Sequence, residues 1–210
     1  MRLLCFGDSI TQGFWDSNGG WVARIRQRYD EDFMNSPNTD YVGVFNLGID
    51  GDTTKNILLR IDSEIASRKW QRGKYAFIIA TGTNDTIYTK TKFQCEPAEY
   101  VAQLEKIVEV CKKYSNLIYF VGLTPVDDKK LNPMPWSKSG KSYSTERMSL
   151  FNDVLKAFCE KNKIGYVSIW DEFTKNSLDK CMYDGVHPND FGHEIIAKKV
   201  YETVTKKVRV

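Results

Sequence analysis

The sequence contains few histidines, no paired cysteine motif and no long apolar run. Only two residues are histidine, and the five cysteines include no Cys-x-x-Cys pair, which excludes zinc-finger spacing. No metal ligand set and no membrane span are therefore expected, because a spanning helix needs about 20 apolar residues. Residues 1–6 lack the hydrophobic region and cleavage site of a signal peptide, so we expect a cytoplasmic protein with reduced thiols; the alternative is an exported form made from a trimmed precursor.

The sequence also lacks a strong charge of either sign. Thirty Lys and Arg residues against 27 Asp and Glu leave a formal charge of +3, and no basic run exceeds two residues. This balance argues against a nucleic-acid partner. The absence of a Gly-x-x-x-x-Gly-Lys loop argues against a nucleotide-binding protein. With 210 residues, the chain is expected to form a single domain over residues 1–210, and nothing indicates its oligomeric state.

Five short apolar runs alternate with longer amphipathic segments. The runs are continuous rather than alternating, which indicates strands buried on both faces of a parallel sheet. The predicted strands are Arg2–Phe6, Tyr41–Leu47, Tyr75–Thr81, Asn116–Gly122 and Ile164–Trp170.

The segments between these runs have the apolar spacing of helices. Helical stripes include Ile57, Ile61 and Ile65, after a Thr53-Thr54 pair that can cap a helix. Further stripes contain Trp21 and Ile25; Val101, Leu104, Ile107, Val108 and Cys111, entered through Pro97; Met148, Phe151, Val154, Leu155 and Phe158; and Ile195, Ile196, Val200 and Val204. The pattern predicts an α/β fold with helices on both faces of a five-stranded sheet, so reactive groups belong at the carboxyl ends of the strands. Two long connections are expected, Asp30–Asp40 and Thr124–Ser142.

The first motif at a predicted strand end is Gly7-Asp8-Ser9. A serine at this position has an exposed hydroxyl and backbone N–H groups nearby as the chain turns. The alternative is an ordinary serine that caps a helix. The motif is not the Gly-x-Ser-x-Gly elbow of α/β-hydrolases, which occurs nowhere in the sequence. Taken alone, it does not distinguish a nucleophile from a cap.

Two glycine-containing turns follow the second and third predicted strands. In the first, residues 46–51, Gly48 removes the side chain where a backbone N–H can approach a ligand. In the second, residues 82–85, Asn84 offers an amide donor. Glycine, asparagine and aspartate are also common in turns without a binding role.

The motif Asp184-Gly185-Val186-His187-Pro188 is more specific. In a tight turn the Asp184 carboxylate lies close enough to accept from Nδ1 of His187, which leaves Nε2 free to act as a base. The other histidine, His193, lies within the last predicted helix and is expected to be a packing or surface residue.

The order of these four motifs along the chain resembles that of the GDSL or SGNH hydrolases, from Ser9 to His187. The resemblance implies a flavodoxin-like three-layer sandwich, with Ser9 as nucleophile completed by His187 and Asp184. It also implies an oxyanion hole formed by the N–H groups of Ser9 and Gly48 and by the side chain of Asn84. Asp50 departs from the small residue of many relatives and is expected to disfavour acidic substrates.

The chemistry implied is hydrolysis of carboxylic esters through an acyl-enzyme, with no cofactor and with a small-molecule ester as substrate. A carbohydrate O-deacetylase, a thioesterase and a lysophospholipase are compatible alternatives. A binding module without turnover is less compatible, because it has no need of Asp184 beside His187. The absence of a Gly-x-x-x-x-Gly-Lys loop also disfavours a nucleotide- or flavin-binding protein.

The connection Thr124–Ser142 combines apolar residues with lysines and has no helical or strand period. Leu131, Met134 and Trp136 are therefore predicted to form a flap over the site, although they could equally anchor the loop. No other insertion could roof a deep acyl tunnel, so a shallow pocket for short acyl groups is expected.

Overall fold

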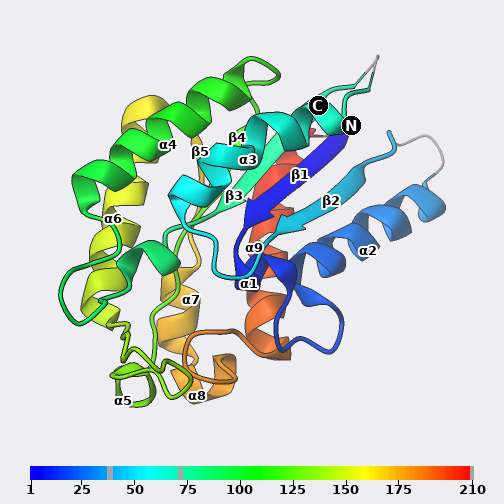
Figure 1. Ribbon diagram of the computed structural model, residues 1–210. Coiled ribbons are helices and arrows are strands. Elements are labelled where there is room, and N and C mark those ends of the chain that lie inside the picture. The colour runs from blue at the N-terminus through cyan, green and yellow to red at the C-terminus, as the bar shows by residue number, and fades with distance from the viewer. Residues whose placement is uncertain (37–39, 71–72, 209–210) are drawn as a thin grey trace.

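The computed structural model describes residues 1–36, 40–70 and 73–208. Its five strands form one parallel sheet in the order β2-β1-β3-β4-β5, and this confirms the predicted five-stranded parallel sheet (Figure 1). The strands are β1 (Arg2–Gly7), β2 (Gly43–Gly48), β3 (Tyr75–Ala80), β4 (Ile118–Val121) and β5 (Gly165–Val167). Because β1 lies between β2 and β3, the chain changes direction across the sheet beside β1, and a binding crevice is expected there.

The five longest described helices correspond to the five predicted amphipathic segments. They are α2 (Gly20–Asn35), α3 (Thr54–Ser67), α4 (Pro97–Lys112), α6 (Thr145–Asn162) and α9 (Asp190–Val208). The short helices are α1 (Ser9–Gln12), η1 (Asn84–Thr86), α5 (Asp128–Leu131), α7 (Trp170–Lys175) and α8 (Leu178–Cys181). Thr53 caps α3 in a capping box with Asn56. Within the described part of the chain, no helix is both long and apolar enough to cross a bilayer.

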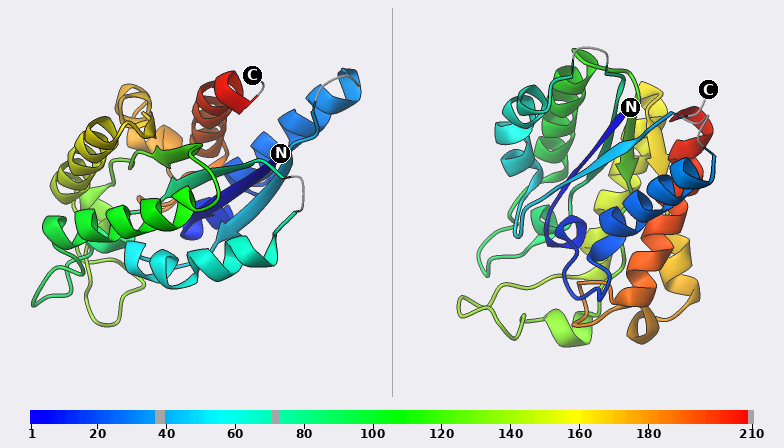
Figure 2. Two further views of the ribbon diagram at one scale, coloured as in Figure 1. Left: turned by 90° about the horizontal axis from the view of Figure 1, so that it is seen from above. Right: turned by 90° about the vertical axis from the view of Figure 1, so that its right-hand side faces the viewer.

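The helices cover both faces of the sheet because alternate strand residues point to opposite sides (Figure 2). On β1, Leu4 and Phe6 join the core under α3, α4 and α6. Leu3 and Cys5 join a second core under α2 and α9. Both faces of β1 are thus buried, which explains its continuous apolar sequence.

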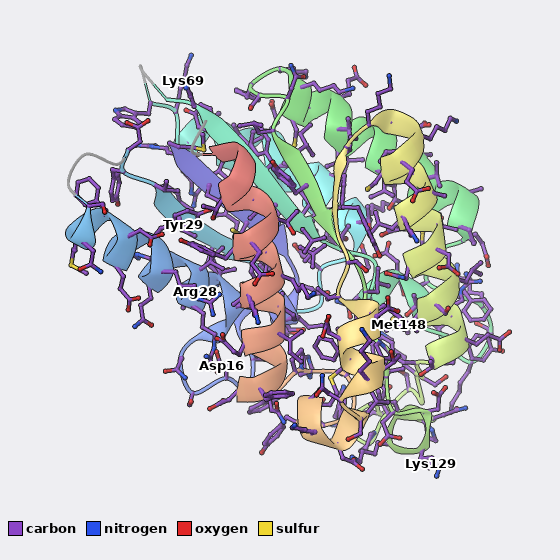
Figure 3. The ribbon with its side chains drawn as sticks, turned by 180° about the vertical axis from the view of Figure 1, so that it is seen from behind. Asp16, Arg28, Tyr29, Lys69, Lys129 and Met148 are labelled. Carbon is purple, nitrogen blue, oxygen red and sulfur yellow. The ribbon has the colours of Figure 1, made fainter. Side chains whose placement is uncertain are left out.

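Helices α2 and α9 lie side by side on the second face. Figure 3 shows Arg28 and Tyr29 on α2, beside α9. The Tyr29 hydroxyl lies 2.9 Å from Thr205 Oγ1, and Arg28 forms an ion pair with Glu194. These contacts fix the first long helix against the last one and so bring distant parts of the chain together.

Two predicted boundaries are wrong. Helix α2 continues to Asn35, so most of the predicted connection Asp30–Asp40 is helical; its residues 37–39 lie outside the described residues. The polar residues before this end are compatible with a helix, since Arg26 and Asp30 form an i,i+4 pair. The predicted strand Ile164–Trp170 ends at Val167, and Trp170 begins α7. An apolar run alone does not distinguish a buried strand from the start of a buried helix.

Two buried carboxyl groups hold the turns at the carboxyl edge of the sheet. Asp8 is 2% exposed, and its Oδ1 accepts from the Ile10 backbone N–H at 3.0 Å, which caps α1. Asp85 is 1% exposed and accepts from the backbone N–H of Thr54 at 2.9 Å, at the start of α3. Burial raises the pKa of Asp8 to about 7 and that of Asp85 to about 6.

The raised pKa of Asp8 predicts a pH-dependent effect of Asp8→Asn on stability. Between about pH 4 and pH 7 the folded protein binds a proton that the unfolded chain has lost, so the contribution of Asp8 to stability falls as the pH rises. Asparagine does not titrate and keeps the capping oxygen. The free energy of unfolding of Asp8→Asn should therefore rise relative to wild type by at most about 1.4 kcal/mol per pH unit in this window.

Urea unfolding of both proteins at several pH values measures this difference. Asp153→Asn removes one exposed carboxyl from α6 and corrects for the general effect of net charge. A difference between Asp8→Asn and wild type that stays constant from pH 4 to 8 would contradict the prediction.

Candidate active site

The four sequence motifs meet at the carboxyl edge of the sheet. Ser9 begins α1 directly after β1, and Gly48 is the last residue of β2. Asn84 begins η1 after β3, and His187 lies in the loop that leads into α9. Ser9, Asn84 and His187 line one cleft of about 510 Å³. The parallel register brings Ser9 and Asn84 to one edge, and the loop before α9 adds His187, which is 178 positions from Ser9 in the chain.

Ser9, His187 and Asp184 form a continuous chain of polar contacts. Ser9 Oγ lies 3.0 Å from His187 Nε2, and His187 Nδ1 lies 2.7 Å from Asp184 Oδ2. A carboxylate at Nδ1 favours the tautomer that carries its proton there, so Nε2 is left as the acceptor for the serine hydroxyl. This arrangement can activate a serine as a nucleophile.

The Asp184 carboxylate accepts several hydrogen bonds. Its Oδ1 accepts from the backbone N–H groups of Val186 at 3.1 Å and His187 at 2.9 Å. Its Oδ2 accepts from the His187 ring and from the Trp15 indole N–H, the latter at 3.1 Å. Partial burial acts to raise the pKa of Asp184, but the hydrogen bonds from His187 outweigh it and hold that pKa below its usual value. Asp184 thus remains an anion beside the imidazole.

Asn84 is held in one orientation within the cleft. Its Nδ2 donates to the Asp52 carbonyl at 3.0 Å, and its Oδ1 accepts from the Tyr143 hydroxyl at 2.8 Å. Burial raises the pKa of Tyr143, so this phenol stays protonated and donates. No sequence motif pointed to Tyr143, which follows the long connection by one residue.

Gly48 makes a close backbone approach but its N–H is already engaged. A Cβ on Gly48 would lie 2.3 Å from the Gln12 nitrogen, so no side chain fits where β2 meets α1. The Gly48 N–H donates to Asn46 Oδ1 at 3.0 Å, and Asn46 in turn donates to the Thr11 carbonyl at 2.9 Å. In this structure the amide therefore has a partner within its own turn.

The three predicted flap residues have different positions. Met134 and Trp136 line the cleft, and the Trp136 ring lies 6.4 Å from the His187 ring. Leu131 is fully buried in the core under α3, α4 and α6 and is not among the lining residues. Its role in the predicted flap is therefore anchoring, because it is the last residue of α5 and packs inward. Asp50 lies at the cleft, as do Lys138 and Lys141.

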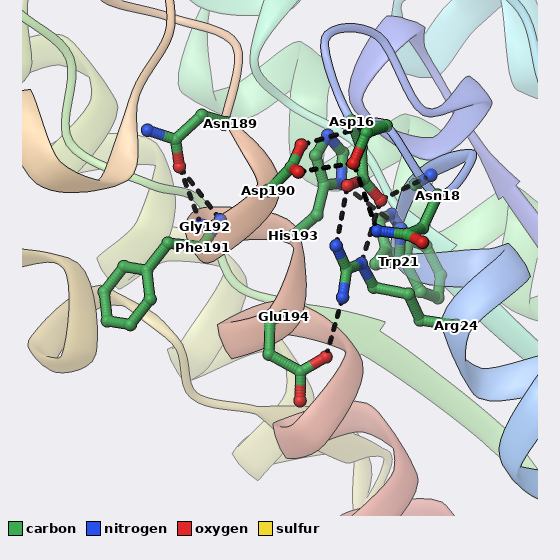
Figure 4. Close-up of polar contacts among 12 residues, drawn as sticks. Asp16, Asn18, Trp21, Arg24, Asn189, Asp190, Phe191, Gly192, His193 and Glu194 are labelled. Atoms are coloured by element: carbon green, nitrogen blue, oxygen red, sulfur yellow. Dashed lines mark hydrogen bonds and ion pairs between the residues drawn. The ribbon is translucent and has the colours of Figure 1, made fainter.

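His193 lies in the interior and packs between loop and helix (Figure 4). Its Nδ1 accepts from the Trp21 backbone N–H at 3.2 Å, and Nε2 lies 2.9 Å from the Phe14 carbonyl, to which it donates. Burial lowers the pKa of His193, which favours this neutral form. The packing role predicted for His193 agrees with these contacts.

The same region fastens the loop of residues 13–19 to α2 and α9 (Figure 4). Asp16 accepts from Arg24 at 2.7 Å and from the Gly20 backbone N–H at 2.8 Å. Although burial opposes it, the Arg24 guanidinium holds the pKa of Asp16 near 2. Asp190 accepts from the Ser17 backbone N–H at 2.9 Å. Among the described residues, no group of three or more His, Cys, Asp or Glu side chains could hold a metal ion.

Comparison with known proteins identifies the family of the chain. The chain matches the model of the GDSL-like lipase/acylhydrolase family over residues 5–195. It is 24% identical to the uncharacterized protein YpmR of Bacillus subtilis (strain 168), over 98% of this chain and 82% of that protein.

Solved structures of similar fold include two with lipolytic or esterase names. A lipase/acylhydrolase from Enterococcus faecalis is 19% identical, covers 98% of this chain and 96% of its own, and has a TM-score of 0.75. An acetylxylan esterase from Geobacillus stearothermophilus is 22% identical, with 97% and 93% covered and a TM-score of 0.72. The family model spans all four motifs, and this chain is a member of the GDSL-like lipase/acylhydrolase family.

Proposed function

We propose that this protein is a serine esterase that hydrolyses carboxylic esters with short acyl groups, and that residues 1–210 act as one catalytic domain without a cofactor. The proposal depends on one observation above all, the contact of Ser9 Oγ with His187 Nε2, backed by Asp184 on the other ring nitrogen. All five cysteines are buried and unpaired, which is compatible with the proposed cytoplasmic location.

In the proposed reaction, neutral His187 takes the Ser9 proton as Oγ attacks the ester carbonyl. The imidazolium then protonates the leaving alcohol, and water repeats the sequence on the acyl-enzyme. Asp184 stabilises the positive charge on His187 in both halves. The three protein groups that these steps use already lie within hydrogen-bond reach along the chain Ser9–His187–Asp184.

The negative charge on the substrate oxygen needs donors close to Ser9. We assign this role to the backbone N–H groups of Ser9 and Gly48 and to the Asn84 side chain. The Gly48 N–H is engaged by Asn46 in the free protein. An oxyanion is a stronger acceptor than an amide oxygen, so it can compete for this N–H in the transition state.

A carbohydrate acetyl ester is the second candidate substrate. The cleft combines the exposed ring of Trp136 with Ser137, Ser139 and Lys141, a mixture of apolar and polar groups that fits a sugar better than a long acyl chain. One structural relative is named an acetylxylan esterase. Acyl thioesters and lysophospholipids offer the same carbonyl chemistry and belong in the test panel.

Ser9 is tested by labelling with a fluorophosphonate. The probe should label the wild-type protein and leave Ser9→Ala unlabelled, because the Ser9 hydroxyl lies 3.0 Å from His187 Nε2, which can accept its proton. Ser139→Ala is the matched control, since Ser139 lines the same cleft without such a partner, and it should label like wild type. Labelling of a folded Ser9→Ala protein would exclude Ser9 as the nucleophile, and an unlabelled wild type would favour a binding module.

Asn84→Ala tests the oxyanion hole. The variant removes a donor that stabilises the negative charge on the substrate oxygen, and this charge develops only in the transition state. The value of kcat should therefore fall by about 10²–10³ with KM nearly unchanged. Steady-state kinetics on p-nitrophenyl acetate measures both constants. Asn35→Ala is the control for the effect of replacing an asparagine by alanine, because Asn35 is exposed at the end of α2, and its kcat should equal that of the wild type. A raised KM with normal kcat would instead assign Asn84 to substrate binding.

Substrate preference is tested with p-nitrophenyl esters of increasing length, acetylated xylo-oligosaccharides and an acyl thioester. Acetyl and butyryl esters should be cleaved faster than chains of about ten carbons, because the cleft is open and has lysines at its rim. Trp136→Ala should lower kcat/KM for the acetylated sugar by roughly 5–100-fold relative to p-nitrophenyl acetate.

Trp70→Ala is the control for this variant, since Trp70 is exposed but does not line the cleft. A preference for long acyl chains would contradict the shallow cleft. An equal effect of Trp136→Ala on every substrate would assign Trp136 to loop anchoring.

A further inference from the structure

Trp15 lies at the rim of the site in a conformation that is unusual for its residue type. Its φ of 62° is in the left-handed region, which non-glycine residues rarely adopt. The ring is 51% exposed and stacks on Tyr183, with ring centroids 4.9 Å apart and planes at 23°. Its indole N–H donates to Asp184 Oδ2 at 3.1 Å. An exposed tryptophan is thus held with its one polar atom on the carboxylate beside His187.

The loop that carries Trp15 is fixed on both sides. Before it, the Phe14 carbonyl accepts from buried His193, and the Phe14 ring lies 5.6 Å from the His187 ring. After it, Asp16 is paired with Arg24, and the Ser17 backbone N–H donates to Asp190. These contacts keep the backbone of residue 15 in place and so sustain the strained φ. The geometry of the indole therefore follows from the fold and does not require a bound ligand.

We propose that Trp15 is a positioning residue that both orients the Asp184 carboxylate and limits how strongly it stabilises the charged form of His187. The inference rests on the proposed function only in assigning a catalytic purpose to this contact. Oδ2 accepts from the indole and from the imidazole, and the two donors share the charge of one oxygen. Without the indole N–H, that oxygen interacts more strongly with the imidazolium, and His187 keeps its proton to a higher pH.

Several other charged groups face His187 and are unchanged by a substitution at Trp15. Asp184 contacts the ring directly, and Asp8 is close enough for a Coulombic interaction from the β1–α1 turn. Asp50, Lys138 and Lys141 line the cleft from the loop after β2 and from the flap. Because all of them are common to wild type and variant, a difference between the two proteins reports the contact of Trp15 with Asp184.

The test is an NMR titration of the two histidines, His187 and His193, in ¹⁵N-histidine-labelled protein. Trp15→Phe keeps a ring that can stack on Tyr183 and removes the N–H. The titration midpoint of His187 should move upward by about half a pH unit or more. His187→Gln assigns the signals. An unchanged or lower midpoint for His187, with the His193 signals unaltered, would overturn the proposal.

The His193 signals show whether the variant loop is still docked, because His193 bonds to the Phe14 carbonyl. If these signals move, the test is repeated with benzothienylalanine at position 15, an analogue that keeps the bicyclic ring and replaces N–H by sulfur. It must give the same upward shift. Trp70→Phe is the matched control, since the Trp70 indole does not bond to Asp184 and Trp70 does not line the cleft, and it should leave the His187 midpoint in place.

Kinetics adds a second measurement that is separable from the first. On p-nitrophenyl acetate, well above the His187 midpoint, Trp15→Phe should change kcat less than about threefold and KM less than about twofold, because the stronger Asp184–His187 interaction does not weaken the base. The pH at half-maximal kcat/KM should shift upward with the NMR midpoint. A wild-type protein that hydrolyses no ester would contradict the proposed function alone, because the titration still decides whether Trp15 acts on His187.

Discussion

The site depends on how closely the end of β2 approaches the first turn after β1. Gly48 lies so near the α1 backbone that a Cβ would come within 2.3 Å of the Gln12 nitrogen and 2.8 Å of the Asp8 carbonyl oxygen. This contact places the turn of Gly48 beside Ser9, and the parallel register of β1 with β3 places Asn84 on the other side. The turns that carry Ser9, Gly48 and Asn84 thus lie at one edge of the sheet without any long loop reaching across the molecule. The constraint is steric, so it is set by the fold before any substrate binds.

The histidine comes to this edge from the far end of the chain. Its position depends on α9, whose first turn holds the loop of residues 13–19 through Asp190 and His193. The same loop contacts Asp184 through the indole N–H of Trp15. His193 therefore has a structural role, although it is not part of the proposed reaction. It ties the backbone next to Trp15 to the helix that follows His187, and it does so in a neutral form favoured by burial.

Much of this arrangement could be predicted from the sequence because strand ends and motifs coincide. Continuous apolar runs predicted the parallel sheet, and the motifs at the ends of the first three runs placed Ser9, Gly48 and Asn84 on one edge. His187 follows no strand end, and its role was inferred from its spacing to Asp184. The limits of prediction were local. Trp170 continues an apolar run into a helix, and Asp30 lies within α2 although it begins a predicted loop. Leu131 points into the core, whereas Met134 and Trp136 line the cleft.

Residues that act through other residues were not predictable. Tyr143 and Trp15 belong to no motif, and their partners Asn84 and Asp184 are 59 and 169 positions away in the chain. A pattern of spacing carries no information about such contacts, because they arise only when two loops pack together. Their hydrogen-bonding atoms are single donors on large rings, and many exposed or buried rings in the chain have the same chemistry with no catalytic neighbour.

The two aspartates near Ser9 show how the number of donors decides which carboxylate can support the histidine. Asp184 accepts two backbone N–H groups, an indole and an imidazole, and these bonds keep its pKa low despite partial burial. Asp8 is more deeply buried and accepts from one backbone N–H at 3.0 Å and from Asn84 at 3.5 Å, so burial dominates and its pKa rises to about 7. Of these two aspartates, only Asp184 stays ionised throughout the neutral pH range. In the proposed reaction, the imidazolium would therefore have a fixed counter-charge on its Nδ1 side, and a protonated Asp8 would not oppose the oxyanion that develops beside Ser9 and Asn84.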